Sequence, residues 1–300
     1  MMQIRLLLDW SMDAKHAIFA EAIRKGCYAG RGLELTLVEP ASKSSEAIEL
    51  VASGDAEMAI NYPHNILLLR PPGSDIVSVG ALVKKNPEGL LSLSATEIER
   101  AADLKGKRIG IGPSPVSRAQ FAVFLSENGL SRENVDIVTV GFEGERLLID
   151  GDIEALDAVE YAITRTRRKG YEVNFMAYSR FGIPDSPFLV FAARRGWVEK
   201  NREAIRGFLT AAAEGFDGVK RWGRDEWGRY TAEIKNRTVE EEIEVWESIQ
   251  PLIEGQGQLF EHSIVALNGL KEILLKKGVL RQDVAIEDIF LNSCLPDTVS

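Results

Sequence analysis

Short apolar segments alternate with segments of helical periodicity through much of the chain, and this alternation limits its fold more than any other feature. Ile4–Leu8 is a compact apolar run, and Asp13–Lys25 repeats apolar residues with helical spacing. Leu33–Val38 then places apolar residues at every second position, as a half-covered strand does. A strand, a helix and a strand in this order predict a βαβ unit, and therefore an α/β fold with mainly parallel strands.

The alternation continues without interruption. We predict helices over Glu46–Ala52 and Pro63–Arg70, and strands over Glu57–Ile60 and Ile76–Leu82. The next apolar run, Leu90–Leu93, is interpreted as the first crossing of the chain into a second lobe.

A second series of strands and helices follows a turn at Asp103–Arg108. Its predicted elements are, in chain order, Ile109–Ile111, Ser117–Glu127, Val135–Val140, Glu145–Asp150 and Ala155–Glu160. Phe188–Ala192 follows a proline-rich turn and is predicted to be a buried strand that returns the chain to the first lobe.

The rest of the chain has an almost entirely helical pattern, from Glu203 to about Lys277. We therefore predict two lobes with a ligand cleft between them. Residues 1–90 and 190–300 would form one lobe and residues 91–189 the other, each a mainly parallel sheet flanked by helices.

The composition excludes several classes of partner. The formal net charge of -9 argues against nucleic acids and anionic membranes, because binding to them uses clustered Lys and Arg. The one basic cluster, Arg165–Lys169, is short and is interpreted as a solvated helix face. Cys27 and Cys294 give no disulfide framework, although one long-range bridge between them stays an alternative, and the scattered histidines predict no metal site.

The start of the chain leaves its location open between two alternatives. The first predicted strand begins almost at once, without the charged segment, apolar segment and cleavage site of a secretory leader. No apolar run reaches the length of about 18 residues that a membrane-spanning helix needs. We expect a periplasmic or lipid-anchored extracytoplasmic protein if a leader has been removed, and a cytoplasmic protein if Met1 is the native start.

The sequence carries no motif for catalysis or cofactor binding. It lacks a P-loop, a complete dinucleotide glycine fingerprint, a paired-histidine metal helix and a nucleophile elbow. We therefore expect a protein that is not an enzyme and has no cofactor.

The first predicted strand ends in Asp9 and Trp10, which brings a large flat side chain to the edge where open α/β folds bind ligands. Trp10 is a candidate stacking platform for a ligand ring, and the alternative is that it packs under the following helix. His16 follows the same strand. Its imidazole could donate a hydrogen bond to a ligand, or it could be a hydrogen-bonded structural residue.

Other candidates follow later strands. Asn61 and Tyr62 offer an amide and an aromatic ring after the third predicted strand. The loop that contains Ser114 could bind a ligand oxygen through free backbone amides, unless its serines only cap the next helix. Glu160, taken as buried, could accept hydrogen bonds from an exocyclic amine, the alternative being a salt bridge to a nearby arginine.

Several short motifs together resemble the NMT1/THI5-like family, in register from about residue 4 to residue 215. The motifs are Leu8-Asp9-Trp10 with His16, Gly32-Leu33-Glu34-Leu35, Glu39-Pro40, the segments 49–54, 78–82 and 103–110, and Gly182-Ile183-Pro184-Asp185. The family is a branch of the type II periplasmic binding proteins, so the resemblance implies a two-lobed α/β fold of that type.

The resemblance also implies a ligand class. The family contains ABC-importer receptors for thiamine pyrimidine precursors and a synthase that makes the pyrimidine phosphate, so we expect two lobes that close on an aromatic heterocycle. Trp10 and His16 match the family's tryptophan and histidine in the first loop. Asp185, at the end of the last motif, joins the expected ligand-binding residues.

The chain departs from the synthase branch at two places. That branch has a lysine at the end of the third strand, where this chain has Asn61, and a cysteine-rich segment where Gly182–Phe188 holds no cysteine. Both departures argue against the synthase. The segment Glu160–Thr164 has fewer aromatic residues than the receptors carry there, which leaves the ligand open.

We therefore predict the solute-binding receptor of an ABC importer, with a ligand such as a hydroxymethylpyrimidine or formylaminopyrimidine precursor of thiamine. The expected partners are this small molecule and an ABC permease of the inner membrane, and the protein is expected to be a monomer. The alternatives are an enzyme of pyrimidine or thiamine biosynthesis on the same scaffold, and a cytoplasmic small-molecule sensing module. The expected ligand-binding residues are Trp10, His16, Asn61, Tyr62, Ser114, Glu160 and Asp185.

Overall fold

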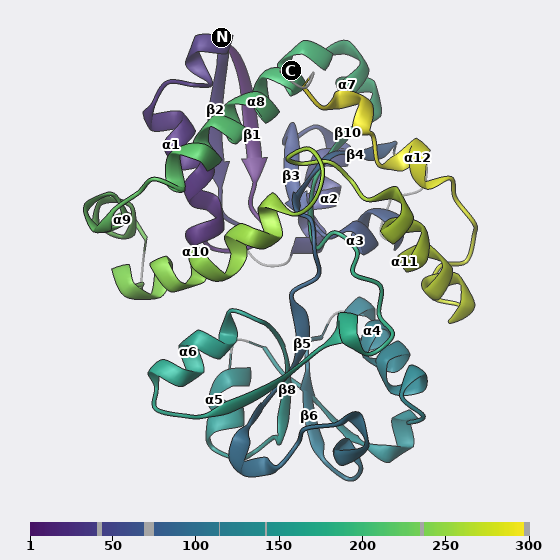
Figure 1. The fold of residues 1–300 in the computed structure, drawn as a ribbon. Helices are drawn as coiled ribbons and strands as arrows, with labels where there is room; N and C mark the ends of the chain where they lie inside the picture. The colour runs from purple at the N-terminus through teal and green to yellow at the C-terminus, as the bar shows by residue number, and fades with distance from the viewer. Residues whose placement is uncertain (41–43, 69–74, 114, 142, 235–236, 297–300) are drawn as a thin grey trace. The chain divides into compact units, whose positions relative to one another are not determined.

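The computed structural model describes residues 1–40, 44–68, 75–113, 115–141, 143–234 and 237–296, and its chain divides into two compact units (Figure 1). The first unit comprises Met1–Lys85, Pro187–Asn268 and Asp283–Ser300. The second comprises Asn86–Ser186 and Gly269–Gln282.

The first unit is built on a mixed five-stranded sheet in the order β2-β1-β3-β10-β4. Its strands are β1 (Met2–Leu7), β2 (Leu33–Val38), β3 (Met58–Asn61), β4 (Ile76–Val83) and β10 (Leu189–Arg194). β1 pairs in parallel with β2 and β3, whereas β10 is antiparallel to both β3 and β4. The ends of β1 and β3 and the start of β10 therefore lie at one edge of the sheet, its carboxyl edge.

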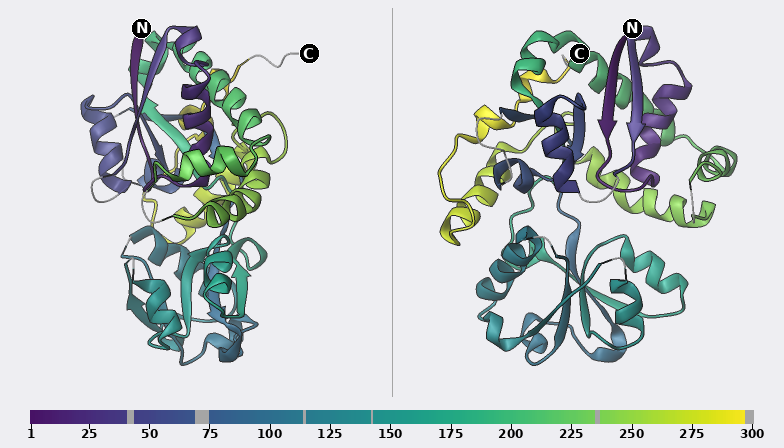
Figure 2. Two further views of the ribbon diagram at one scale, coloured as in Figure 1. Left: turned by 90° about the vertical axis from the view of Figure 1, so that its left-hand side faces the viewer. Right: turned by 180° about the vertical axis from the view of Figure 1, so that it is seen from behind.

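Two helices cover one face of this sheet side by side, α1 (Ala17–Arg24) and α8 (Arg202–Val219) (Figures 1 and 2). The rings of Phe19 on α1 and Phe208 on α8 both pack against Phe191 of β10. The other helices of the unit are α2 (Ser44–Ser53), α3 (Pro63–Leu68), α7 (Arg195–Lys200), α9 (Arg224–Thr231), α10 (Val239–Glu254) and α12 (Ile286–Ile289).

The second unit is also built on a mixed five-stranded sheet, in the order β7-β6-β8-β5-β9. Its strands are β5 (Glu88–Leu93), β6 (Arg108–Ile111), β7 (Asp136–Thr139), β8 (Ala155–Val159) and β9 (Val173–Ala177). One face packs against α4 (Pro115–Glu127) through the core that contains Leu90, Phe121 and Phe124. The other face carries a smaller core around Leu91 and Leu156, beside α5 (Gly144–Ile149) and α6 (Ala162–Arg168).

The α/β class is confirmed, but the sheets are mixed and not mainly parallel as expected, because β10 and β5 each run antiparallel to both of their neighbours. Several local predictions are also corrected. Leu90–Leu93 does not cross between lobes but is the inner part of β5, hydrogen-bonded between β8 and β9. Leu90 and Leu91 are buried because they face the two cores of the second unit, and Leu93 is partly buried beside the smaller one. β9 was not predicted, and α6 was anticipated only as the solvated helix face assigned to Arg165–Lys169. Residues 269–282, expected in the first lobe, belong to the second unit, where Ile273 of α11 (Ile264–Lys276) packs against the core.

The described part of the chain contains no helix that is both long enough and apolar enough to span a membrane.

The contact between α1 and α8 predicts a steric requirement at Gly215. A Cβ added there would lie 2.0 Å from the backbone oxygen of Ile18. We expect Gly215→Ala to lower the free energy of unfolding by about 1–3 kcal/mol, as overpacking does. Gly228→Ala, on α9 with open space around its Cβ, should be neutral or raise it by about 0.5–1 kcal/mol. Urea denaturation of both variants tests this requirement, and equal stabilities would contradict it.

Candidate functional site at the carboxyl edge of the first sheet

The segment after β1 separates an acidic side chain from an aromatic one. The Leu8 amide donates to the Val38 carbonyl at 2.9 Å, so the strand pairing continues one residue beyond β1. Asp9 is then buried, whereas Trp10 is 43% exposed. The chain thus turns a carboxylate inward and leaves a large apolar surface facing solvent.

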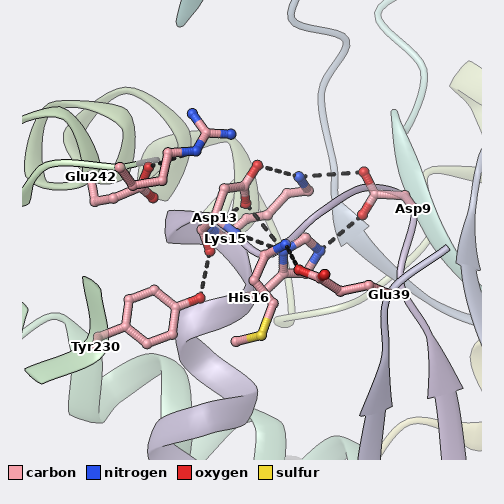
Figure 3. A network of polar contacts seen from close by, with 9 residues as sticks. Asp9, Asp13, Lys15, His16, Glu39, Tyr230 and Glu242 are labelled. Atoms are coloured by element: carbon pink, nitrogen blue, oxygen red, sulfur yellow. Dashed lines mark hydrogen bonds and ion pairs between the residues drawn. The ribbon is translucent and has the colours of Figure 1, made fainter. Parts of the chain in front are cut away.

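Four buried side chains follow this strand and bind one another, and we call them the β1 network (Figure 3). They are Asp9, Asp13, Lys15 and His16. The Lys15 ammonium lies between two carboxylates, 2.7 Å from Asp13 Oδ2 and 3.3 Å from Asp9 Oδ2. His16 Nε2 lies 3.0 Å from Asp9 Oδ1 and closes the ring of contacts.

The local sequence explains why the network forms. Asp13 is the N-cap of the turn Ala14–His16 that leads into α1, and its side chain accepts a hydrogen bond from the Lys15 amide at 3.2 Å. With the imidazole neutral, the Asp13 backbone amide donates to His16 Nδ1 at 3.2 Å, which makes a reciprocal capping box. The helix start therefore brings Asp13, Lys15 and His16 together, and the strand end supplies Asp9.

Neighbouring elements hold this turn in place. Tyr230 of α9 donates its hydroxyl to the Asp13 carbonyl at 2.7 Å, and the Met12 amide donates to Glu39 Oε1 at 2.7 Å (Figure 3). Glu242 of α10 is fully buried beside them, with Arg237 Nε 3.6 Å from its carboxylate. Segments distant in sequence thus converge on one loop.

Electrostatics favour the fully charged form of the network. Burial raises the pKa of Asp9, but the charge of Lys15 and the hydrogen bond from His16 outweigh burial and lower that pKa overall. The pKa of Asp13 is lowered in the same way, against burial, by Lys15 and His16. For His16, burial and the charge of Lys15 lower the pKa. The Asp13 and Asp9 carboxylates raise it by a larger amount, so the net shift is upward. When His16 is protonated, its Nδ1–H faces Asp13 Oδ1 at 3.2 Å in place of the capping bond, and two cations balance two anions.

The placement of His16 favours a structural role. The side chain is fully buried, and Nδ1 lies 3.2 Å from both the amide nitrogen and Oδ1 of Asp13. Both ring nitrogens therefore face groups of this chain. The sequence signal that could have identified the rest of the network is the capping aspartate, Asp13, three residues before His16.

The two predicted residues at the end of β3, Asn61 and Tyr62, also differ in burial. Asn61 is fully buried, and its Oδ1 accepts hydrogen bonds from the Tyr62 amide and from Asn65 Nδ2, each at 2.8 Å. Tyr62 is half-buried, with its ring stacked on His64 at 5.2 Å and edge-on to Phe188 at 5.2 Å. Burial lowers the pKa of His64 to about 3, so this imidazole is neutral at pH 7.

The predicted residues of the second unit have different surroundings. Ser114 lies outside the described residues. Glu160 was expected to be buried but is exposed, because it stands in the turn between β8 and α6. Asp185 is also exposed, and its Oδ1 accepts a hydrogen bond from the Asn86 amide at 2.9 Å. This hydrogen bond thus connects the end of the segment Asn86–Ser186 to its first residue.

Within the described ranges, no group of three or more His, Cys, Asp or Glu side chains is arranged to hold a metal ion. The acidic members of the β1 network already have a lysine between them.

Comparison with known proteins gives a family and a fold. Residues 13–220 match the family model described as NMT1/THI5 like. The chain is 26% identical over 218 residues to the formylaminopyrimidine-binding protein of Halalkalibacterium halodurans, across 71% of this chain and 65% of that protein. It is 27% identical over 221 residues to the 4-amino-5-hydroxymethyl-2-methylpyrimidine phosphate synthase of Schizosaccharomyces pombe, across 70% and 63%. The alignments thus span less than two thirds of these relatives.

Among solved structures, the periplasmic aliphatic sulphonate binding protein SsuA from Escherichia coli is similar over nearly the whole chain. The TM-score is 0.77 at 15% identity, with 98% of this chain and 99% of that chain covered. At this identity the similarity shows the fold alone, which is that of a periplasmic binding protein.

The buried lysine of the β1 network gives a direct stability prediction. We expect Lys15→Met to lower the free energy of unfolding by about 3–5 kcal/mol, because it leaves two buried carboxylates without their shared cation. Lys25→Met removes an ammonium that is paired with Glu21 but is 41% exposed, and should cost less than about 1 kcal/mol. Denaturant unfolding compares the two, and similar losses would refute the central role of Lys15.

The raised pKa of His16 predicts a pH dependence with a definite sign. The folded state binds the His16 proton more tightly than the unfolded chain, whose pKa is about 6.5. The stability that His16 contributes is therefore complete below about pH 6.5 and declines as the pH rises through the folded-state value. The stability difference between wild type and His16→Gln should shrink from pH 5 to pH 9.

His64 is the matched control, because its folded-state pKa is lowered. Its contribution is present above about pH 6.5 and declines as the pH falls, so the difference for His64→Gln should change in the opposite direction. Parallel pH profiles for the two variants would contradict the assignment.

Proposed function

The chain belongs to the NMT1/THI5-like family, and from this premise we propose that it is the solute-binding receptor of an ABC importer for a small aminopyrimidine. The observation that carries the proposal is Trp10, an exposed indole on a loop that the buried β1 network holds in place. The formylaminopyrimidine-binding protein among its relatives supports this ligand class. The ABC permease and an extracytoplasmic location are proposed on the same grounds, supported by the fold shared with SsuA.

Trp10 suits an aromatic ligand for a physical reason. A heterocycle that stacks on an indole removes apolar surface of both rings from water and adds a geometry-dependent attraction. The loop is fixed before the ligand arrives, so little conformational entropy is lost when the ring binds. Tyr62, half-buried at the end of β3, offers a second aromatic surface at the same edge of the first sheet. Glu160 and Asp185 offer exposed carboxylates in the second unit.

A synthase of the pyrimidine phosphate is the second candidate, because the fission yeast relative carries that name. The residues here favour a receptor. Asn61 stands where the resemblance places the synthases' lysine, and its amide oxygen is occupied by two hydrogen bonds within the chain. An amide has no nucleophilic amine with which to form a covalent bond to a carbonyl compound.

Isothermal titration with formylaminopyrimidine and hydroxymethylpyrimidine tests the proposal. We expect one of them to bind, and Trp10→Ala to weaken its binding by about 1–3 kcal/mol, by analogy with stacking of bases on aromatic side chains. The fold should survive, since the indole is largely exposed. Tyr171→Ala, which removes another exposed aromatic side chain from the second unit, should leave the affinity unchanged.

Three results would contradict the proposal. Neither pyrimidine binds, the two variants weaken binding equally, or the purified protein converts the ligand into a pyrimidine phosphate. The last result would establish the synthase in place of the receptor.

A further inference from the structure

Two carboxyl groups of the second unit lie on the same face of its sheet. In the pairing of β5 with β8, Asp157 is opposite Leu90 and Glu88 is opposite Val159. Glu88 and Leu90 are two residues apart on one strand, so Glu88 and Asp157 are diagonal neighbours, with Cβ atoms about 7 Å apart. Leu90 belongs to the core under α4, which identifies the face that both carboxyls share.

Neutral groups hold these two carboxyls in place. Gln120 of α4 donates its amide to Glu88 Oε2 at 2.7 Å, and the Tyr178 hydroxyl donates to Asp157 Oδ1 at 2.9 Å. Tyr178 itself is almost fully buried, while Glu88 and Asp157 are half-buried. The pair is therefore tied to α4 on one side and to the turn after β9 on the other.

Several charged groups of the surrounding elements have other partners. On α4, Arg118 binds the Thr139 hydroxyl, and Glu127 near the far end lies 3.7 Å from Lys276 of α11. Lys169 directly follows α6 and pairs with Glu145 of α5 at 2.9 Å. Both helices lie beside the opposite face of the sheet. The influences on Glu88 and Asp157 are then burial, each other, the Tyr178 phenol and the amides of Gln120 and Asn86.

Such surroundings oppose ionisation of both carboxyls. Two negative charges at this separation repel each other, and burial penalises each of them, while neutral donors compensate only in part. Burial first, and the Glu88 carboxylate next, raise the pKa of Asp157 to about 8. Burial also raises the pKa of Glu88.

We propose that Glu88 and Asp157 hold one proton between them at neutral pH, and that loss of this proton loosens the place where the chain enters the second unit. The chain enters the second unit at Asn86 and Pro87, and Glu88 is the first residue of β5. The Glu88 backbone amide donates to Asn86 Oδ1 at 2.9 Å. The Pro87 carbonyl accepts a hydrogen bond from the Glu160 amide at 2.8 Å, just after β8. Repulsion between the two carboxylates would push β5 and β8 apart beside these contacts. The proposal concerns the protein without ligand and goes beyond the receptor function.

The sign of the effect follows from proton linkage. The folded state holds a proton that the unfolded chain, with carboxyl pKa values of about 4, has released. The contribution of this pair to the stability of the second unit is therefore greatest below about pH 4 and falls as the pH rises towards 8.

Infrared titration of the whole protein between pH 5 and pH 10 tests the shared proton. In wild type, the carbonyl band of one protonated carboxyl should persist at pH 7 and disappear near pH 8. In Asp157→Asn, this band should be absent at pH 7, or the pH at which it disappears should be strongly shifted. Asp152→Asn, which replaces an exposed carboxyl of the same unit, should keep the wild-type band. Absence of the band in wild type at pH 6–7 would overturn the proposal.

Hydrogen exchange tests the mechanical consequence. The protection factors of the Glu88 and Glu160 backbone amides should fall as the pH rises from 5 towards 8 in wild type and level off above pH 8, and they should stay constant in both Asp157→Asn and Glu88→Gln, each of which removes the repulsion. A fall of equal size in all three proteins would overturn the link between the proton and this contact. Because no ligand takes part, the result is independent of whether a pyrimidine binds.

Discussion

The position of the Lys15 ammonium between the Asp9 and Asp13 carboxylates is the interaction on which the proposed site depends. Without it, two buried negative charges would stand at the end of β1, and the chain could not turn there at low cost. His16 completes the balance of charge, and Tyr230 secures the turn from α9. Trp10 follows Asp9 directly and is 43% exposed beside this buried arrangement.

Periodicity predicted most of the fold because it reports which face of an element is buried. It located β2 over the observed residues, Leu33–Val38. It failed for β5, because a short apolar run of a buried strand has no alternation and resembles a connection as easily as a strand. β9 was missed because it is only five residues long and Asn174 interrupts its apolar residues. The placement of residues 269–282 depends on a tertiary contact of Ile273 that no local pattern reveals.

The candidate site could be predicted only as far as residue type and strand ends determine it. An aromatic side chain after a strand was expected at Trp10, and its exposure fits that expectation without testing it. The roles of His16 and Asn61 depend on which partners surround them, and the structure turns both toward their own chain. The acid pair of the second unit was not foreseen, since Glu88 and Asp157 become neighbours only through strand pairing.

The central claim is that a buried charged network presents Trp10 to the ligand and does not itself touch the ligand. A crystal structure of the protein with formylaminopyrimidine bound tests it most directly. The account predicts the pyrimidine ring stacked against Trp10, with His16 still turned to Asp9 and Asp13. A ligand nitrogen bound to His16, or a ring bound away from Trp10, would contradict it.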